Sequence, residues 1–241
     1  AELPLKENLK LIAGARYEYT NISLLNQADD TASLINNDIL PAITLNWGVN
    51  EKMNLRWAYS RTLARPTFRE LAPYASFDFI GDFILVGNND LERTLIDNVD
   101  FRWEFYPNYG ELIAVGLFYK HFNNPIERTF NIQAVNPELT YRNVDAANLA
   151  GIEFELRKNL SFISPKLENF SFGFNASYIY SRVDIDSLEL VAIRALNPDA
   201  SSTRQMFGQS PFLINLLISY QNQKGTSANL AFNIQGRQIS V

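Results

Sequence analysis

Apolar and polar residues alternate at every second position along most of the chain. The run NVDFRWEF, residues 98–105, is typical: its valine, phenylalanines and tryptophan alternate with asparagine, aspartate, arginine and glutamate. A period of two is the pattern of a β-strand that has one apolar and one polar face. The pattern predicts nine strands, within residues 9–20, 39–49, 53–62, 98–105, 113–119, 152–157, 170–180, 212–220 and 228–235.

The predicted connections alternate in length. The long ones cover residues 24–38, 63–92, 123–138 and 186–210, whereas the short ones are NEK, PNYG and QNQKG, with the intermediate KNLSFISPKLEN between them. A transmembrane β-barrel has tight turns at one end and long loops at the other, and its strands run to about ten residues. A soluble sheet packed on one face shows the same strand alternation and is the alternative.

The two faces of the predicted strands have different chemistry. In a barrel the uncharged stripes face lipid and the polar stripes face a watery lumen. Aromatic residues at stripe ends fit two interfacial girdles: Tyr17, Tyr19, Tyr178 and Tyr180 near the long loops, and Phe105, Tyr106 and Tyr220 near the short turns. The predicted fold is an all-β, antiparallel, up-and-down transmembrane β-barrel segment.

The strand number and the chain ends suggest part of a larger barrel. Bacterial barrels have an even number of strands, whereas nine are predicted here. The chain starts at an apparent short turn, PLKEN, and stops within an alternating run at Val241. We therefore expect residues 1–241 to be part of one β-barrel domain.

Composition excludes several classes of protein. The net charge of -5 disfavours nucleic acid as a partner, since phosphate binding needs a basic surface. The chain has no cysteine, which excludes disulfides and thiolate metal sites. It also has no apolar run long enough for a transmembrane helix.

The segment RTLARPTFRELAP, residues 61–73, places Arg61, Arg65 and Arg69 four residues apart. A continuous basic helix is excluded because Pro66 lacks a backbone donor and disfavours helix at the residue before it. Thr67 and Glu70 form a capping-box pattern, so we predict a strand ending near residue 62 and one helical turn ending before residue 73. Above a lumen rim, these arginines would pair with lumen carboxylates or contact an anionic ligand.

The segment YASFDFIGDFILV, residues 74–86, is rich in aromatic residues although it lies in a predicted long loop. It predicts either an extra strand pair over residues 77–86 or a platform on which ligand rings stack. The exposed candidates for ligand contact are Phe77, Phe79 and Phe83.

Catalytic and metal sites have weak support. Glu153 and Glu155 share a strand face, as in a paired-carboxylate hydrolase, but a wet strand face has the same pattern. His121 is the only histidine, and an outer-membrane phospholipase would need a serine beside it on the lipid-facing side. Calcium is conceivable at the loop aspartates, although such loops are commonly acidic: Asp29, Asp30, Asp38, Asp184 and Asp186. No catalytic, cofactor or metal site is predicted.

Three segments carry a resemblance to a known family: YSRTLARPTFRELAP, GNNDLERTLIDNVDFRWEFYPNYGELIAVGLFYKHFNNPIE and NLAGIEFEL. They resemble, in order, the C-terminal barrel of TonB-dependent outer-membrane receptors. The resemblance implies about nine to eleven strands of a barrel of about 22. It also implies that a plug domain closes the barrel and that the energised inner-membrane TonB complex opens it. The implied location is the outer membrane of a Gram-negative bacterium, where the barrel contacts lipid.

The resemblance implies uptake of a large extracellular ligand, such as a siderophore, haem, cobalamin or an oligosaccharide. A plug, a TonB box and the usual final aromatic residue are not seen in this sequence. A passive outer-membrane channel or structural barrel, or a soluble all-β binding module, is the alternative. The residues that match motif positions, expected to be mainly structural, are Arg65, Pro66, Phe68, Glu70, Leu71, Gly87, Asn88 and Leu91. Arg61 and Arg69 join Phe77, Phe79 and Phe83 as candidates for ligand contact.

Overall fold

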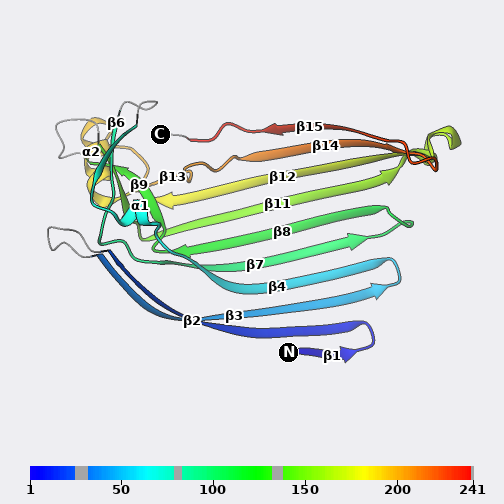
Figure 1. Ribbon diagram of the computed structural model, residues 1–241, viewed down its shortest axis with the longest axis horizontal. Coiled ribbons are helices and arrows are strands. Elements are labelled where there is room, and N and C mark those ends of the chain that lie inside the picture. Colours follow the sequence, from blue (N-terminus) through cyan, green and yellow to red (C-terminus); the bar gives the residue numbers. More distant parts are fainter. Residues whose placement is uncertain (25–31, 79–82, 132–137, 240–241) are drawn as a thin grey trace.

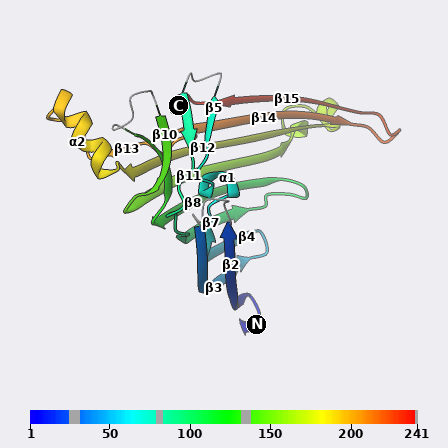
Figure 2. The same ribbon diagram turned by 60° about the vertical axis from the view of Figure 1, so that its left-hand side comes forward.

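The computed structural model describes residues 1–24, 32–78, 83–131 and 138–239. Most of them form one sheet of eleven strands, in which every neighbouring pair is antiparallel. The sheet is strongly twisted (Figure 2). Its strands, in spatial order, are β1 (Glu2–Lys6), β2 (Leu9–Leu24), β3 (Ala32–Asn50), β4 (Met53–Ala64), β7 (Thr94–Phe105), β8 (Leu112–Asn123), β11 (Ala146–Asn159), β12 (Phe170–Asp184), β14 (Phe212–Gln221) and β15 (Ser227–Gln235), while β13 (Thr203–Arg204) pairs with β12.

All nine predicted strands are present, and several are longer than predicted. β2 and β3 continue into the predicted loop 24–38, as far as the pair Leu24 and Ala32. β11 starts at Ala146, before the predicted residue 152. The expected turn PLKEN was wrong in part, because Pro4 to Lys6 belong to β1. Backbone pairing continues past the alternating stripes, since hydrogen bonds between strands need no apolar face.

Tight turns lie at one end of the sheet and long connections at the other, as predicted (Figure 1). The two short helical segments η1 (Leu160–Phe162) and η2 (Pro165–Leu167) belong to the turn end. At the loop end lie α1 (Phe68–Leu71) and α2 (Ser187–Leu196). Among the described residues, no helix is both long and apolar enough to span a membrane.

A second sheet of four strands stands at the loop end. Its order is β5 (Ala75–Asp78), β6 (Phe83–Val86), β10 (Glu138–Asn143) and β9 (Ile126–Phe130). The strand pair predicted within residues 77–86 is confirmed as β5 and β6. β9 and β10 were not predicted. β10 pairs in parallel with β6, which is distant in sequence, and a local pattern cannot show such pairing.

The strand register makes one face of the main sheet continuously apolar. Residues paired across neighbouring strands share a face, so a single row can be followed from strand to strand. The apolar residues of this row, together with those above and below it, form what we call the apolar face. The row consists of Leu11, Leu45, Trp57, Phe101, Leu117, Ile152, Tyr178 and Phe212.

The opposite face, which we call the polar face, carries amides and charged groups in the same continuous register. One of its rows consists of Asn54, Glu104, Ala114, Glu155, Asn175, Asn215 and Asn233. The predicted separation of apolar and polar stripes is thus confirmed across successive strands. A sheet with two such faces suits two different solvents, one on each side.

The predicted girdles agree with the apolar face, with one exception. Tyr17, Tyr19, Tyr178 and Tyr180 are all more than half exposed near its loop end. Tyr106 was assigned wrongly, because its hydroxyl donates a hydrogen bond of 3.1 Å to Glu104 on the polar face. Tyr106 directly follows Phe105, the last residue of β7. Successive side chains of an extended chain point to opposite sides, so Tyr106 is turned away from the apolar face.

The largest packed core lies at the loop end rather than on the main sheet. It joins α1 to the second sheet through Leu71, Phe83, Leu85, Leu91, Leu139 and Tyr141. A smaller buried cluster contains Val144, Ala147 and Val183. The loop end is therefore a packed body above the main sheet. We call α1, α2, β13 and the second sheet together the loop-end body.

Candidate functional site

The turn that follows β4 has the predicted caps. The Thr67 backbone N–H donates to Glu70 Oε2 at 2.7 Å, and the Glu70 N–H donates to Thr67 Oγ1 at 3.4 Å. This reciprocal pair is a capping box, which satisfies donors that the first helical turn leaves free. Pro66 is buried at the start of the turn.

Arg65 connects this turn to β2. Its Nε donates to Thr20 Oγ1 at 2.8 Å, and its Nη2 pairs with Glu18. Glu18 lies on the polar face, opposite the stripe that contains Tyr17. Of the three arginines, Arg65 makes the contact expected with a polar-face carboxylate.

Arg61 lies on the apolar face. Its Nε and Nη2 donate to the two carboxylate oxygens of Asp97 at 2.8 and 3.0 Å, and the Tyr59 hydroxyl donates to Asp97 Oδ1 at 2.7 Å. Arg61 therefore points away from the polar face, contrary to the lumen position expected for it. Its odd number, shared with Tyr59, was the sequence signal. Arg69 is exposed and forms no ion pair with another described residue.

A polar row crosses the apolar face at its loop end. His121 Nδ1 and Asn148 Oδ1 are 2.8 Å apart, and the Tyr119 hydroxyl donates to Asn148 Oδ1 at 2.6 Å. The row contains no serine, so within the described sheet His121 has no nucleophile there of the kind a phospholipase needs. Its members, on successive strands, are Arg61, Asp97, His121, Asn148 and Arg182. The row marks where the apolar band ends.

Gly87 and Asn88 fasten the second sheet to the capped turn. A Cβ at Gly87 would lie 2.2 Å from the carbonyl oxygen of Ala72, so only glycine allows this approach. The Asn88 N–H donates to the Glu70 carbonyl at 2.6 Å, and its side-chain amide donates to the Tyr141 carbonyl at 2.9 Å. Leu71 and Leu91 are in the core beside them, at 1% and 3% exposure. These motif residues make packing and backbone contacts.

The aromatic candidates differ in exposure. Phe83 was expected to be exposed, but it is 6% exposed and packs in the core because its strand turns that side toward Leu71. Phe77 is half exposed. Phe79 lies outside the described residues. Phe68, a motif position expected to be structural, is 67% exposed at the surface of the turn.

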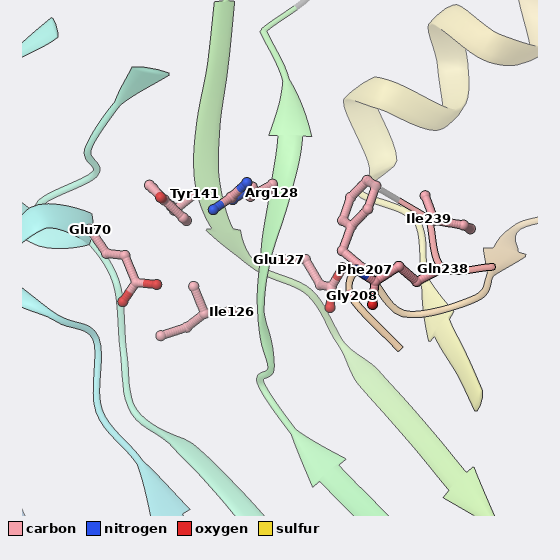
Figure 3. A pocket seen from close by; sticks show the side chains of 9 residues that line it. All are labelled: Glu70, Ile126, Glu127, Arg128, Tyr141, Phe207, Gly208, Gln238 and Ile239. Atoms are coloured by element: carbon pink, nitrogen blue, oxygen red, sulfur yellow. The ribbon is translucent and has the colours of Figure 1, made fainter. Parts of the chain in front are cut away.

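A cavity of about 330 Å³ opens beside this body (Figure 3). The Arg128 guanidinium lies 5.9 Å from the centre of the Tyr141 ring. The cavity thus offers a cation, carboxylates and an aromatic ring, a mixture suited to a polar ligand that carries rings. The sequence interpretation missed it because its walls come from segments that are far apart in the sequence, including α1, β9 and β10. The lining residues are Glu70, Ile126, Glu127, Arg128, Tyr141, Phe207, Gly208, Gln238 and Ile239.

Charged residues on the polar face pair with one another. Arg102 donates to Glu104 at 2.8 Å and to Glu155 at 2.6 Å, and Arg157 donates to Glu155 at 3.0 Å. Glu155 is thus engaged by two arginines, an arrangement typical of an ion-pair ladder on a wet face. Its neighbour Glu153 lines a hollow that also includes Arg56 and Arg102.

Two of the aspartates considered for calcium have other partners, and Asp184 lies at the end of β12. Asp38 accepts a hydrogen bond from Arg93 at 2.6 Å, and Asp186 caps α2 by accepting from Leu188 and Glu189. Asp29 and Asp30 lie outside the described residues. Within the described ranges, histidine, aspartate and glutamate form no group of three or more that could hold a metal ion.

Comparison with known proteins assigns the family. The model of the family described as "TonB dependent receptor-like, beta-barrel" matches residues 1–238. Among curated proteins, none matches the sequence.

Solved structures agree in fold. The siderophore receptor PirA from Pseudomonas aeruginosa superposes with a TM-score of 0.65 at 17% identity, over 98% of this chain and 38% of that one. The alcaligin outer membrane receptor FauA from Bordetella pertussis gives a TM-score of 0.60 at 14% identity, over 98% and 36%. A ferric enterobactin receptor (PfeA) variant from P. aeruginosa, in complex with enterobactin, gives a TM-score of 0.62 at 15% identity, over 98% of this chain and 32% of that one. The chain thus spans about a third of the length of these receptors, and it belongs to the family of TonB-dependent receptor β-barrels.

Proposed function

We propose that this chain is part of the single β-barrel domain of an outer-membrane receptor that imports a large ligand with energy from the TonB complex. The observation that carries the proposal is the continuous register of one apolar and one polar face over successive strands. A closed barrel in a membrane needs lipid on one side and water on the other, and this sheet supplies both surfaces. The family is one of receptors and transporters rather than enzymes.

A ferric siderophore is the ligand class we favour among siderophores, haem, cobalamin and oligosaccharides. The support is the fold shared with receptors whose names specify siderophores. The loop-end body presents cationic and aromatic groups to the outside, and these suit an anionic ligand that carries rings. We propose Arg69, Phe77 and Phe79 as ligand contacts. Arg61 and Phe83 are not proposed, since Asp97 holds the first and the core buries the second.

The two faces of the sheet define the proposed partners. Outer-membrane lipid of a Gram-negative bacterium would surround the apolar face. The receptor's own plug domain would lie against the polar face, where the hollow beside Arg56, Arg102 and Glu153 is lined by both signs of charge. The inner-membrane TonB complex would act through that plug.

The experiment is ligand uptake by cells that express the full-length protein containing this chain. A strain that lacks the gene for this protein is compared with the same strain carrying the gene, both with and without TonB. Uptake of radiolabelled ferric siderophores, haem, cobalamin and oligosaccharides is measured under iron limitation. We expect uptake of one ferric siderophore that needs both the protein and TonB. Uptake that needs the protein but not TonB would instead establish a passive channel. Recovery of the protein in the soluble fraction would contradict a membrane location.

A further inference from the structure

Unpartnered buried polar atoms gather at one place in the loop-end body. Six buried side-chain nitrogen or oxygen atoms among the described residues lack a hydrogen-bond partner, and four of them belong to one cluster. Buried polar groups in proteins are nearly always satisfied, so four together need an explanation. The atoms are Glu127 Oε2, Thr129 Oγ1, Glu189 Oε2 and Arg204 Nε. We call these four residues the carboxylate cluster.

The cluster joins three elements that are separate in the sequence. Glu127 and Thr129 project from the same side of β9, Glu189 comes from α2 and Arg204 from β13. The exposed fractions of Glu127, Thr129 and Glu189 are 6%, 1% and 8%. Through Glu189, the cluster therefore contributes to holding α2 against the rest of the loop end.

Arg204 pairs directly with only one of the two carboxylates of the cluster. Arg204 Nη2 lies 2.9 Å from Glu127 Oε2, although this ion pair lacks hydrogen-bond geometry. Arg204 Nη1 and Nη2 also donate to the carbonyl groups of Gln205 and Arg128, at 3.2 and 3.3 Å. Its guanidinium carbon also lies 3.8 Å from the centre of the Phe207 ring. None of these Arg204 contacts involves the Glu189 carboxylate.

α2 turns a carboxylate inward beside apolar side chains: Glu189 is buried, and Leu190 and Ile193 are partly buried. Glu189 is its buried residue, whereas Leu188, Val191 and Leu196 are 42%, 68% and 92% exposed. A helix normally docks through its apolar face. Because α2 also turns a carboxyl group inward, the charge on that group affects how stably the helix docks.

Burial, first, and then three charged groups act on the ionisation of Glu189. Arg204 favours its ionised form, whereas Asp186 at the helix N-cap and Glu127 on β9 disfavour it. Burial, the largest cause, raises the pKa of Glu189 further. Burial likewise raises the pKa of Glu127, against the opposing effects of Arg204 and of a hydrogen bond from the Phe207 backbone. Two carboxylates at one site do not both ionise readily.

We propose that Glu127 and Glu189 hold one proton between them while α2 is docked, and that losing this proton releases α2. A proton on either group removes one buried negative charge and supplies a hydrogen-bond donor. Carboxyl groups whose ionisation is disfavoured in the docked state stabilise it at low pH, and this stabilisation is lost as the pH rises. Since Glu127 also lines the cavity, loss of this proton would change the charge beside one of its walls.

Hydrogen exchange tests this proposal on the full-length receptor in detergent. The exchange of amides 187–196 is measured from about pH 5 to about pH 9, corrected for the intrinsic pH dependence of exchange, because this window covers a raised carboxyl pKa. We expect corrected exchange to rise at the upper end by up to about tenfold per pH unit. Glu189→Gln and Glu127→Gln should each remove the rise and keep α2 protected, since a neutral amide replaces the protonated acid.

The matched control is Asp199→Asn, which removes the same charge at an exposed position just after α2. This variant should follow the wild type. A flat wild-type profile would overturn the proposal, as would a transition that persists unchanged in either glutamine variant. Loss of α2 protection at every pH in both glutamine variants would also contradict it, because a neutral side chain should then hold the helix.

Discussion

Arg65 Nε lies 2.8 Å from Thr20 Oγ1, so the turn after β4 is fastened to β2, across the intervening strand β3. Thr20 is 7% exposed, and Glu18 on the same strand accepts from the same guanidinium. A side chain in the most distinctive motif thus connects the loop-end body with the main sheet. This contact is structural, and it places α1 at the rim of the polar face.

Replacing Arg65 should loosen that connection. We expect Arg65→Ala to leave the Thr20 hydroxyl without this buried partner and to increase hydrogen exchange in α1 and at the loop end of β2. Arg16→Ala is the matched control: it removes the other arginine that pairs with Glu18, and its side chain is 68% exposed. Exposed pairs contribute little, so exchange in this control should stay at the wild-type level. Equal effects of both variants would count against the structural role of Arg65.

Gly87 should tolerate no side chain. Gly87→Ala would bring a Cβ to 2.2 Å from the carbonyl oxygen of Ala72 and 2.8 Å from that of Arg69, both backbone atoms. We expect the second sheet to lose about 1–3 kcal/mol of stability, as overpacked sites do. Limited proteolysis of the loop end would detect the loss. Gly14→Ala, where nothing lies within 4 Å of the added Cβ, is the control and should resist as the wild type does.

The first and last residues of the helical turn α1 should differ sharply in their effect on stability. Leu71→Ala removes a side chain that is 1% exposed, and we expect a cost of about 2–5 kcal/mol in the opening free energy of the second sheet. Phe68→Ala removes a larger side chain that is 67% exposed, with an expected cost below about 0.5 kcal/mol. Native-state hydrogen exchange measures both. A large cost at Phe68 would mean that another part of the full-length protein covers it.

The assignment of lipid to the apolar face can be tested with a single charge. Leu117 lies in the middle of that face and is 49% exposed. We expect Leu117→Arg to destabilise the membrane-embedded barrel by about 2–4 kcal/mol, the cost of an arginine near the bilayer midplane. Asn175→Arg introduces the same group on the polar face, where water is available. The amount of folded protein in outer-membrane fractions should fall only in the first variant; an equal fall in both would contradict the assignment.

The turn end should be sensitive to acid. Glu111 accepts hydrogen bonds from Lys158 at 2.6 Å and Asn108 at 2.8 Å, and the Lys158 ammonium is the main reason that its pKa is lowered. A lowered carboxyl pKa stabilises the folded state above the ordinary pKa of glutamate, and this stabilisation is lost as the pH falls through the lowered value. Hydrogen exchange at residues 107–111 should therefore increase in acid, the opposite direction to that predicted for α2.

Replacement of Glu111 provides the check on this pH dependence. Glu111→Gln should show faster exchange at neutral pH and little further change in acid. Glu168→Gln, at the same end of the sheet, serves as a control because the Glu168 backbone carbonyl makes its contact with Asn159 and persists in the variant. An acid response that survives in Glu111→Gln would assign it to another group.

The pattern along the chain determined the main sheet. Alternation in segments such as residues 98–105 predicts both the strand and the side of each residue, because successive side chains point to opposite faces whatever their partners are. The capping box at Thr67 and Glu70 was predictable for a similar reason, since its contacts are confined to three residues. The same alternation predicts that Arg61 lies on the face of Tyr59, because the two residues are two positions apart in one strand.

The loop-end body depended on tertiary structure. The parallel pairing of β6 with β10, the burial of Phe83 and the meeting of Glu127, Glu189 and Arg204 join segments far apart in sequence. Such contacts depend on which loops the barrel end brings together, and no local period encodes them. Side-chain direction within a strand follows from backbone geometry alone, whereas partners across loops follow from packing. The sequence alone therefore determined the two faces of the sheet, while the tertiary structure decided the cavity, the core above it and the carboxylate cluster.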